Sequence, residues 1–333
     1  MKILKPHTFD DKVKIERPIP VLTIGEHTIL SKGNLCVVSG KVKTGKSALN
    51  YSLLSGGIRM EGLPIDTLGI SVSLSREEFA VLHFDTEQSQ YDWHSKLMNT
   101  VKRAQLNSKP DFFESFHLLE FTILDRIRYV EEMFEYNHRK HGGIHLAVVD
   151  GVADLVRSVN DEVECNKIVD MFHRLAVEYQ CPIILLAHLN PDGGKMRGHL
   201  GSQLERKAES VIVVEREGEI SNITPLYCRN ANFLKIPLQQ FYWDDEKKQH
   251  SFYGQKTEKD KQEQKIAEYE DVLVEIFANS ESEMKKSQFK DRISEVMGVK
   301  KSSAYSIINF MLNHTLIVED EETRVISRVN VAV

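Results

Sequence analysis

The strongest constraint on the fold is the stretch Ser39–Ser47, which reads Ser-Gly-Lys-Val-Lys-Thr-Gly-Lys-Ser. It follows a short apolar run, Leu35–Val38, and precedes a helix-like segment, Ala48–Leu54. The pattern G-x-x-x-x-G-K-S between a strand and a helix is that of a phosphate-binding loop, or P-loop. The glycines let successive backbone N–H groups face a phosphate, and the helix N-terminus adds partial positive charge. The flanking strand and helix favour this interpretation over an ordinary glycine turn.

The residues of this loop predict a nucleoside triphosphate with Mg²⁺ as the ligand. Lys46 can reach the β- and γ-phosphates, and the Ser47 hydroxyl can ligate Mg²⁺. The other loop residues offer backbone N–H groups to the phosphates, and they are Gly40, Lys41, Val42, Lys43, Thr44 and Gly45. We therefore expect ATP and Mg²⁺ as cofactors.

The composition is that of a soluble globular protein, with 333 residues of which 41% are hydrophobic and 28% charged. No apolar run approaches the ~18 residues of a membrane span, and the N-terminus has no apolar signal segment. The four cysteines are scattered without a C-x-x-C pair, which indicates reduced thiols and no structural zinc. We expect a cytoplasmic protein. Its net charge of −6 decides nothing about nucleic acid, so a DNA site has to come from local patches.

Buried strands alternate with amphipathic helices through the first two thirds of the chain. Apolar strand-like runs cover 35–38, 80–84, 145–149 and 182–187, and helical patterns lie between them. This alternation predicts an α/β fold, a mostly parallel sheet with helices on both faces. From residue 211 onward short strands follow one another without helices, which predicts an antiparallel extension of the sheet.

Polar side chains follow three of these strands, where ligands bind in parallel sheets. Asp150 closes one strand and is placed as a Walker-B carboxylate for Mg²⁺, although an Asp-Gly turn cap is the alternative. Glu87 follows another strand, and its carboxylate can orient or deprotonate a water; a surface acid is the alternative. His188 ends the strand after that of Asp150, where it can contact the γ-phosphate, although a lone histidine is more often structural.

Together these residues resemble the RecA-like branch of P-loop ATPases, nearest the DnaB-type replicative helicases and the RepA-type hexameric ATPases of plasmids and mobile elements. The resemblance covers roughly residues 22–245. It implies a RecA-like fold, ATP hydrolysis with Glu87 as the catalytic glutamate, and a sensor role for His188. The segment Tyr227–Asn230 is similar to the family's K-x-R-N segment, in which an arginine, here Arg229, reaches the neighbouring subunit's ATP site. A homo-oligomer, such as a hexamer, is therefore expected.

The segment that follows the strand ending at His188, here called the sensor strand, resembles the helicase stretch that carries a DNA loop in the central channel. It contains the basic candidates Lys195, Arg197 and His199. We expect the loop over 191–200 to contact single-stranded DNA, the alternative being a flexible surface loop.

Two departures from the family pattern matter. Tyr227 stands where the helicases carry a lysine, and the helical N-terminal domain of replicative helicases has no counterpart in this sequence. Unwinding of DNA therefore does not follow from the resemblance.

The C-terminal segment is interpreted as a small domain of three helices and a hairpin, which resembles a winged helix. Its third helix, predicted to start at a capping Ser302 or Ser303, would enter a major groove. Six basic residues against two acidic ones lie between Lys285 and Lys301, which favours duplex DNA over a protein contact. The candidates for contact are Lys300, Lys301, Ser303, Tyr305, Ser306 and Asn309. The hairpin would be the wing of such a domain, and its acidic turn, Glu319–Glu322, argues against contact between the wing and DNA phosphates.

The predicted organisation has four parts: an N-terminal arm or edge strand over 1–30, a RecA-like ATPase domain over 31–253, a charged linker or solvated helix start over 254–264 and a winged-helix-like domain over 265–333. Two functions are compatible with it. The first is an oligomeric, DNA-dependent ATPase, with or without helicase activity, that serves replication or mobilisation of a plasmid or mobile element. The second is an ATP-gated DNA-binding regulator that hydrolyses slowly.

Overall fold

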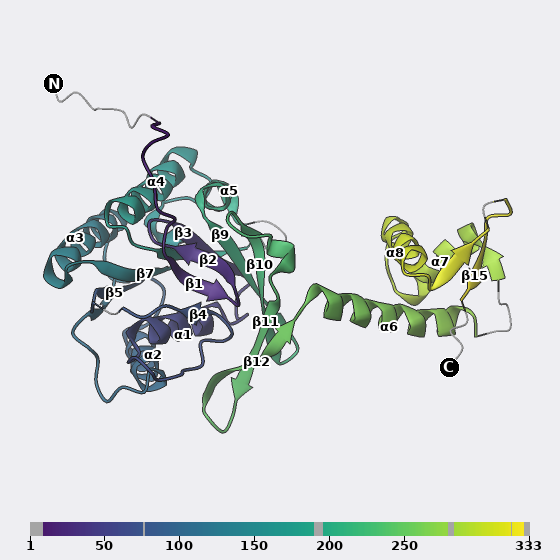
Figure 1. Ribbon diagram of the computed structural model, residues 1–333, viewed down its shortest axis with the longest axis horizontal. Helices are drawn as coiled ribbons and strands as arrows, with labels where there is room; N and C mark the ends of the chain where they lie inside the picture. Colours follow the sequence, from purple (N-terminus) through teal and green to yellow (C-terminus); the bar gives the residue numbers. More distant parts are fainter. Residues whose placement is uncertain (1–8, 76, 190–195, 279–282, 321, 330–333) are drawn as a thin grey trace. The chain divides into compact units, whose positions relative to one another are not determined.

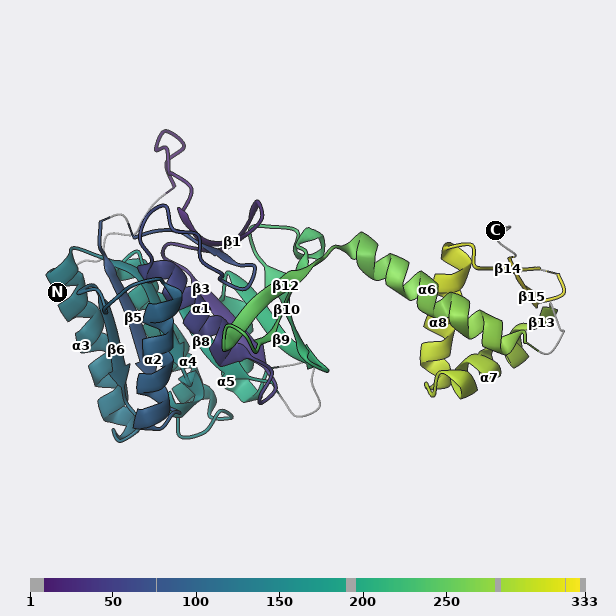
Figure 2. The ribbon, with the colours of Figure 1, turned by 90° about the horizontal axis from the view of Figure 1, so that it is seen from below.

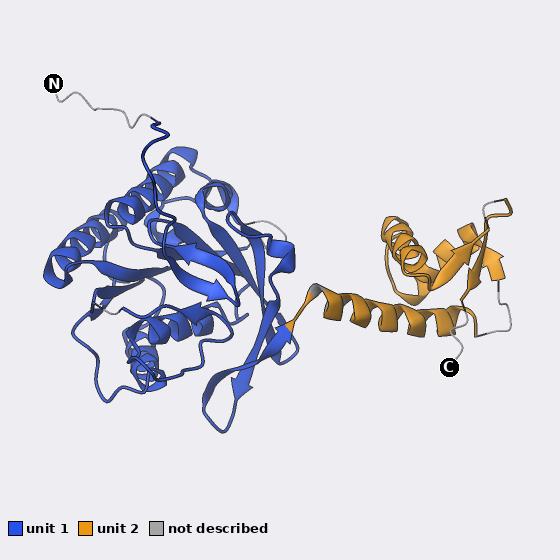
Figure 3. Cartoon of the chain, viewed as in Figure 1, with its two compact units in different colours: residues 1–255 blue, residues 256–333 orange. Residues whose placement is uncertain are grey.

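The computed structural model describes residues 9–75, 77–189, 196–278, 283–320 and 322–329. The chain divides into two compact units, residues 1–255 and residues 256–333 (Figure 3). In the described part of the chain, no helix is long and apolar enough to cross a membrane.

The first unit is built on a nine-stranded sheet, counted over the described residues, with the order β12-β11-β10-β9-β3-β8-β7-β5-β6. Its parallel part consists of β3 (Leu35–Gly40), β5 (Ala80–Asp85), β6 (Phe113–His117), β7 (Ile144–Asp150), β8 (Ile183–His188) and β9 (Ser210–Glu217). At the β9 side the sheet continues through β10 (Ile220–Cys228) and β11 (Leu238–Asp244), which are antiparallel, to β12 (Gln249–Lys256). The predicted parallel sheet with its antiparallel extension is confirmed.

Helices cover both faces of this sheet (Figures 1 and 2). One face packs against α1 (Lys46–Ile58) and α2 (Gln90–Arg103), and the other against α3 (Ile123–His141), α4 (Glu162–Glu178) and α5 (Gly198–Lys207). Short 3-10 turns lie at Val152–Leu155 and Phe233–Lys235. Local chemistry fixes the helix starts, because the side chains of Ser89, Thr122 and Asp161 accept backbone N–H bonds at the N-termini of α2, α3 and α4.

The beginning of the chain, over 1–30, was predicted to be an arm or an edge strand. Residues in that range form β1 (Pro20–Ile24) and, with Ser31, β2 (His27–Ser31), which join β4 (Ser71–Val72) in a small antiparallel sheet. Leu22 and Ile29 are fully buried in the core that α1 also contacts. Residues 20–31 therefore follow the strand alternative, and burial of such side chains makes them part of the first unit.

The second unit contains α6 (Glu258–Ile276), α7 (Lys286–Val296) and α8 (Lys301–Asn313), with β13 (Glu283–Lys285), β14 (Ile317–Glu319) and β15 (Val325–Arg328). The three strands form an antiparallel sheet in the order β13-β15-β14, and its apolar residues form a core of their own. The hairpin of β14 and β15 was predicted, whereas β13 was not.

The segment 254–264 was predicted to be a charged linker or the start of a solvated helix, and the structure has the helix start: β12 runs to Lys256, and a capping box between Thr257 and Asp260 starts α6. The predicted caps of α8 were wrong, because neither Ser302 nor Ser303 caps this helix, whose N-cap residue is Lys300 without a side-chain cap bond.

Candidate nucleotide-binding site

The P-loop connects β3 to α1, and packing requires glycine at two of its positions. A Cβ on Gly40 would lie 2.3 Å from the Val214 carbonyl oxygen on β9. A Cβ on Gly45, whose φ is +104°, would lie 2.6 Å from the Phe241 ring on β11. No side chain fits at these distances, so the loop lies directly against the antiparallel extension of the sheet.

Lys46 begins α1, and its ammonium is held inside the loop. The Nζ donates hydrogen bonds to the carbonyl oxygens of Gly40 at 2.9 Å and Lys41 at 2.6 Å. Burial lowers the pKa of Lys46, while the carboxylates of Glu87 and Asp150 act in the opposite direction. The two carboxylates thus favour the charged form of Lys46, against the effect of its burial.

A cleft of about 670 Å³ gathers the residues predicted to bind and hydrolyse ATP. Besides P-loop residues, including Ser47, its lining contains Glu87, Asp150 and His188, each at the carboxyl end of a parallel strand. The lining also contains side chains that sequence reasoning missed, among them Lys96 and Arg103 on α2, Arg216 on β9, and Trp243 and His250 on the antiparallel extension. No motif marks these residues, because the fold alone brings them to the cleft.

Glu87 and His188 contact each other directly. The His188 Nε2 and the Glu87 Oε1 lie 3.2 Å apart, and each side chain is more than one third exposed. This hydrogen bond is the largest cause that lowers the pKa of Glu87, with the charge of Lys46 adding to it. Glu87 is therefore an ionised carboxylate that His188 holds at the mouth of the cleft.

Asp150 ends β7 and lies deep in the same cleft. Burial, followed in effect by the nearby carboxylates of Asp85 and Glu87, raises the pKa of Asp150 to about 7. The nearest side-chain donor is the Asn50 amide, at 3.5 Å from Asp150 Oδ2. This excess of negative charge is the environment in which a bound cation stabilises a carboxylate.

Asp85, the last residue of β5, is a fully buried carboxylate that sequence reasoning passed over. Its Oδ1 accepts the backbone N–H groups of Glu87 at 3.1 Å and Gln88 at 2.9 Å. Its Oδ2 accepts the Tyr51 hydroxyl of α1 at 3.3 Å and the Gln88 side-chain amide at 2.8 Å. Asp85 thereby ties the turn that carries Glu87 to the P-loop helix. The signal that singled out Asp150, an acid closing an apolar strand, was present here too.

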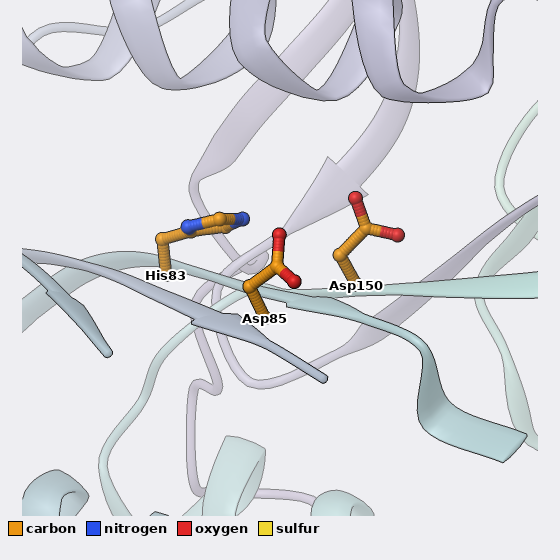
Figure 4. A group of neighbouring side chains, drawn as sticks. All are labelled: His83, Asp85 and Asp150. Atoms are coloured by element: carbon orange, nitrogen blue, oxygen red, sulfur yellow. The ribbon is translucent and has the colours of Figure 1, made fainter. Parts of the chain in front are cut away.

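His83, Asp85 and Asp150 form a buried group that projects from one face of the sheet (Figure 4). One ligand atom from each lies within 4.8 Å of the others, as metal ligands would. However, the oxygens of Asp85 already accept four donors, and His83 Nδ1 lies 2.8 Å from the Ser115 hydroxyl. Burial lowers the pKa of His83 to about 4, which keeps its ring neutral. We interpret the group as a hydrogen-bonded layer beneath the site.

Arg229 lies at the opposite end of the sheet from the P-loop. It follows β10, whose last residue pairs with Ser210, the first residue of β9. Its guanidinium donates to the carbonyl oxygens of Arg206, Lys207 and Ala208, at 3.3 to 3.4 Å, where α5 ends. A cation is favourable there because the helix macrodipole is negative at its C-terminus. Arg229 is thus not part of the cleft of its own chain.

The buried carboxylate of Glu209 fixes the backbone beside Arg229. It accepts the Ser31 N–H at 2.7 Å and the Asn230 side-chain amide at 2.6 Å, and the Glu209 carbonyl accepts the Arg229 N–H at 2.8 Å. At its other end, α5 is joined to the sensor strand, since the Arg197 N–H donates to the His188 carbonyl at 3.2 Å. One helix therefore connects His188 with Arg229.

The predicted DNA-contacting residues are placed as follows. Arg197 and His199 are exposed at the start of α5, and Lys195 lies outside the described residues. On the second unit, Ser303, Tyr305, Ser306 and Asn309 are exposed on α8, as are Lys300 and Lys301. The Lys301 ammonium forms an ion pair with Asp291 at 2.7 Å.

The donor set suits Mg²⁺. The Ser47 hydroxyl and the Asp150 carboxylate are both in the cleft, and hard oxygen ligands are those that Mg²⁺ prefers. The crowding of Asp150 by Asp85 and Glu87 is the charge imbalance that a divalent cation would offset.

A parallel sheet, a P-loop and a carboxylate at the neighbouring strand end together define the P-loop nucleoside triphosphatase class. The family model described as the AAA domain matches residues 4–194, which is more than half of the chain. The chain therefore belongs to this family of P-loop ATPases. The comparison with curated proteins gives no match.

Proposed function

We propose that the protein is an oligomeric, DNA-dependent ATPase of the RecA and DnaB type that acts in replication or mobilisation of a plasmid or mobile element. The observation that carries the proposal is the Glu87–His188 contact in the same cleft as Lys46. A carboxylate oriented by a sensor histidine is the arrangement needed for a hydrolytic site rather than for a simple nucleotide-binding site.

The chain's own residues account for most of the chemistry. The P-loop N–H groups and Lys46 bind the phosphates and stabilise the charge that develops on them. Glu87, ionised and held by His188, orients the attacking water and accepts its proton. Ser47 and Asp150 would hold Mg²⁺, which when bound neutralises phosphate charge.

The oligomer enters the proposal through Arg229. Its guanidinium lies at the far end of the sheet, so it can complete an ATP site only in a second copy of the chain. An arginine supplied in this way is a known means of stabilising the transition state of phosphoryl transfer. A closed ring, such as a hexamer, places every Arg229 beside a neighbour's cleft.

DNA is proposed to bind at two places. Arg197 and His199 are exposed beside the sensor strand, which suits a contact with single-stranded DNA that depends on nucleotide state. The second unit has three helices and a sheet of the order β13-β15-β14, a topology that supports assignment as a winged helix. We propose that this unit binds duplex DNA.

A second candidate function is an ATP-gated DNA-binding regulator with slow hydrolysis. Tyr227, at the position where the helicases carry a lysine, is half exposed and its ring contacts Phe233 edge-on. It supplies no second cation to a neighbour's phosphates, which favours slower turnover.

The experiment that separates the two functions is the ATPase rate with and without single-stranded DNA, combined with size analysis in the presence of nucleotide. The motor predicts assembly with ATP and a rate that rises with DNA. The regulator predicts a slow rate that DNA leaves unchanged. Lys46→Ala serves as the inactive control, and Lys167→Ala, an exposed lysine on α4, serves as the matched active control.

A further inference from the structure

The second unit carries a cationic cleft that the sequence pattern did not single out. It measures about 360 Å³, and its lining includes Lys285, Lys286, Lys290, Tyr305 and Arg324. These residues come from the end of β13, the first turns of α7, the first half of α8 and the position directly before β15. Four of them are cationic, and no acidic side chain lines the cleft among the described residues. We call this surface the Tyr305 cleft.

An exposed aromatic ring lies at the centre of the charges. Tyr305 is 50% exposed, and the ammonium groups of Lys286 and Lys290 each lie 5.7 Å from the centroid of its ring. Cation–π attraction of this kind holds flexible lysines beside the ring. The cleft therefore presents an aromatic surface and positive charges together.

One carboxylate beside the cleft holds two of the cationic side chains in place but neutralises only part of their positive charge. Glu319 accepts hydrogen bonds from Lys286 at 2.6 Å and from Arg324 at 3.0 Å. These bonds, that of Lys286 first, lower the pKa of Glu319, so the carboxylate is ionised. Lys285 and Lys290 have no ion pair within the described residues. The four cations of the lining and the Glu319 carboxylate together carry a charge of +3, in a chain whose net charge is −6.

The neighbouring surfaces are less suited to a polyanion. In the turn between β14 and β15, the Asp320 carboxylate accepts the N–H groups of Glu322 and Thr323, and these bonds lower the pKa of Asp320. The turn is therefore negatively charged. At the start of α8, Asp291 neutralises Lys301. Repulsion at the first surface and charge pairing at the second favour the Tyr305 cleft.

We infer that the Tyr305 cleft is where the second unit binds the sugar–phosphate backbone of DNA. Lys285 and Lys290 contact phosphates, and the Tyr305 ring packs against a sugar or an unpaired base. The inference rests on the proposed DNA binding and assigns it to the β13–α7 side of the unit, in place of the acidic turn and the first residues of α8. Duplex and single-stranded DNA share this backbone chemistry.

The test compares two double variants of the full chain that remove the same charge. Lys285→Gln/Lys290→Gln changes the cleft, and Lys300→Gln/Lys301→Gln changes the start of α8. Fluorescence anisotropy with a short labelled duplex, and with one of its strands alone, gives affinity as a function of salt without nucleotide. We expect the cleft variant to bind about tenfold more weakly and the slope of log affinity against log salt to fall by about 2. The α8 variant should keep the parent slope.

A third variant tests the ring. Tyr305→Ala should weaken binding about fivefold or more without changing the salt slope, because it removes packing but no charge. Circular dichroism of each variant establishes that the unit remains folded. Loss confined to the duplex would assign the cleft to duplex DNA, and loss on both probes would assign it to the backbone that both share.

Different results overturn different statements. If the parent binds DNA but the α8 variant loses affinity while the cleft variant does not, the inference is wrong and the proposed DNA binding stands. Equal losses in both variants also overturn it, since they would indicate unspecific attraction. A parent chain that binds neither probe at low salt overturns the proposed DNA binding itself, and the inference with it.

Discussion

The two ends of the large sheet differ in what they offer to ATP. At the carboxyl end of the parallel strands, Lys46, Glu87 and Asp150 share a cleft, so residues suited to phosphate binding and water positioning lie within one chain. At the opposite end, Arg229 is held by backbone carbonyls and lies outside that cleft. Under the proposed function, binding of ATP therefore needs one copy of the chain, whereas fast hydrolysis needs two.

The largest expected effect tests the Arg229 end. Arg229→Ala should lower turnover by ~10³–10⁵ while ATP binding survives. Lys46→Ala should be inactive too, but mixing the two variants creates interfaces in which an intact P-loop meets an intact arginine. Part of the activity should then return in an ATPase assay of the mixture.

Two outcomes would contradict the division of the site between copies. The first is a fully active Arg229→Ala protein. The second is a mixture that stays inactive although size analysis shows that the variants assemble together.

The next effect tests the cleft end within one chain. Glu87→Gln should bind ATP as the parent does and lose about 10²–10⁴ in turnover, because the amide cannot accept the proton of the attacking water. The measurement pairs fluorescent nucleotide binding with steady-state hydrolysis. Hydrolysis at the parent rate would show that Glu87 is not the base.

A smaller effect tests how the cleft is held in shape. Asp85→Asn should lower kcat about tenfold with little change in KM, because a charged acceptor for the Glu87 N–H is replaced by a neutral one. Asp161→Asn is the matched control, since the Asp161 carboxylate also accepts a backbone N–H, but at the start of α4 and not in the turn that carries Glu87. If KM rises and kcat holds, Asp85 supports nucleotide binding rather than Glu87.

The smallest effect is a pH dependence at Asp150. Its folded pKa of about 7 lies above the ordinary value of 3.8, so its contribution to stability is present at low pH and is lost as pH rises through about 7. Without Mg²⁺ and nucleotide, Asp150→Asn should therefore melt higher than the parent at pH 8, on the order of a few degrees. At pH 5, closer to the ordinary value of 3.8, the difference in melting temperature should be smaller. If the difference in melting temperature does not change with pH, burial of the Asp150 charge is not its cause.

Much of the first unit could be predicted from the sequence. Its strands are short continuous apolar runs, and its functional side chains directly follow them, so Glu87, Asp150 and His188 were located by position alone. The contact between Glu87 and His188 could not be predicted from the sequence, because the two residues are far apart in the chain and only the pairing of the strands brings them together.

The parts that were missed share a physical cause. Trp243 and His250 reach the cleft through antiparallel strands whose sequence has no motif, and the pairing of residues 20–24 with β4 was not predicted. In the second unit, the Tyr305 cleft gathers residues from β13, α7, α8 and the turn before β15, so no single helix pattern showed it. Local patterns report local chemistry, and these features depend on long-range pairing.

The helix α5 joins the two ends of the sheet that the predictions treat separately. Its ten residues span ~15 Å, and a helix of this length moves as a stiff body. One end is hydrogen-bonded to the His188 carbonyl through Arg197, and the other supplies the carbonyls on which the Arg229 guanidinium rests. If copies of the chain share their ATP sites as proposed, a displacement of the strand end at His188 would shift α5 as a unit and move Arg229 with it, so that the state of one ATP site would affect the arginine supplied to the next.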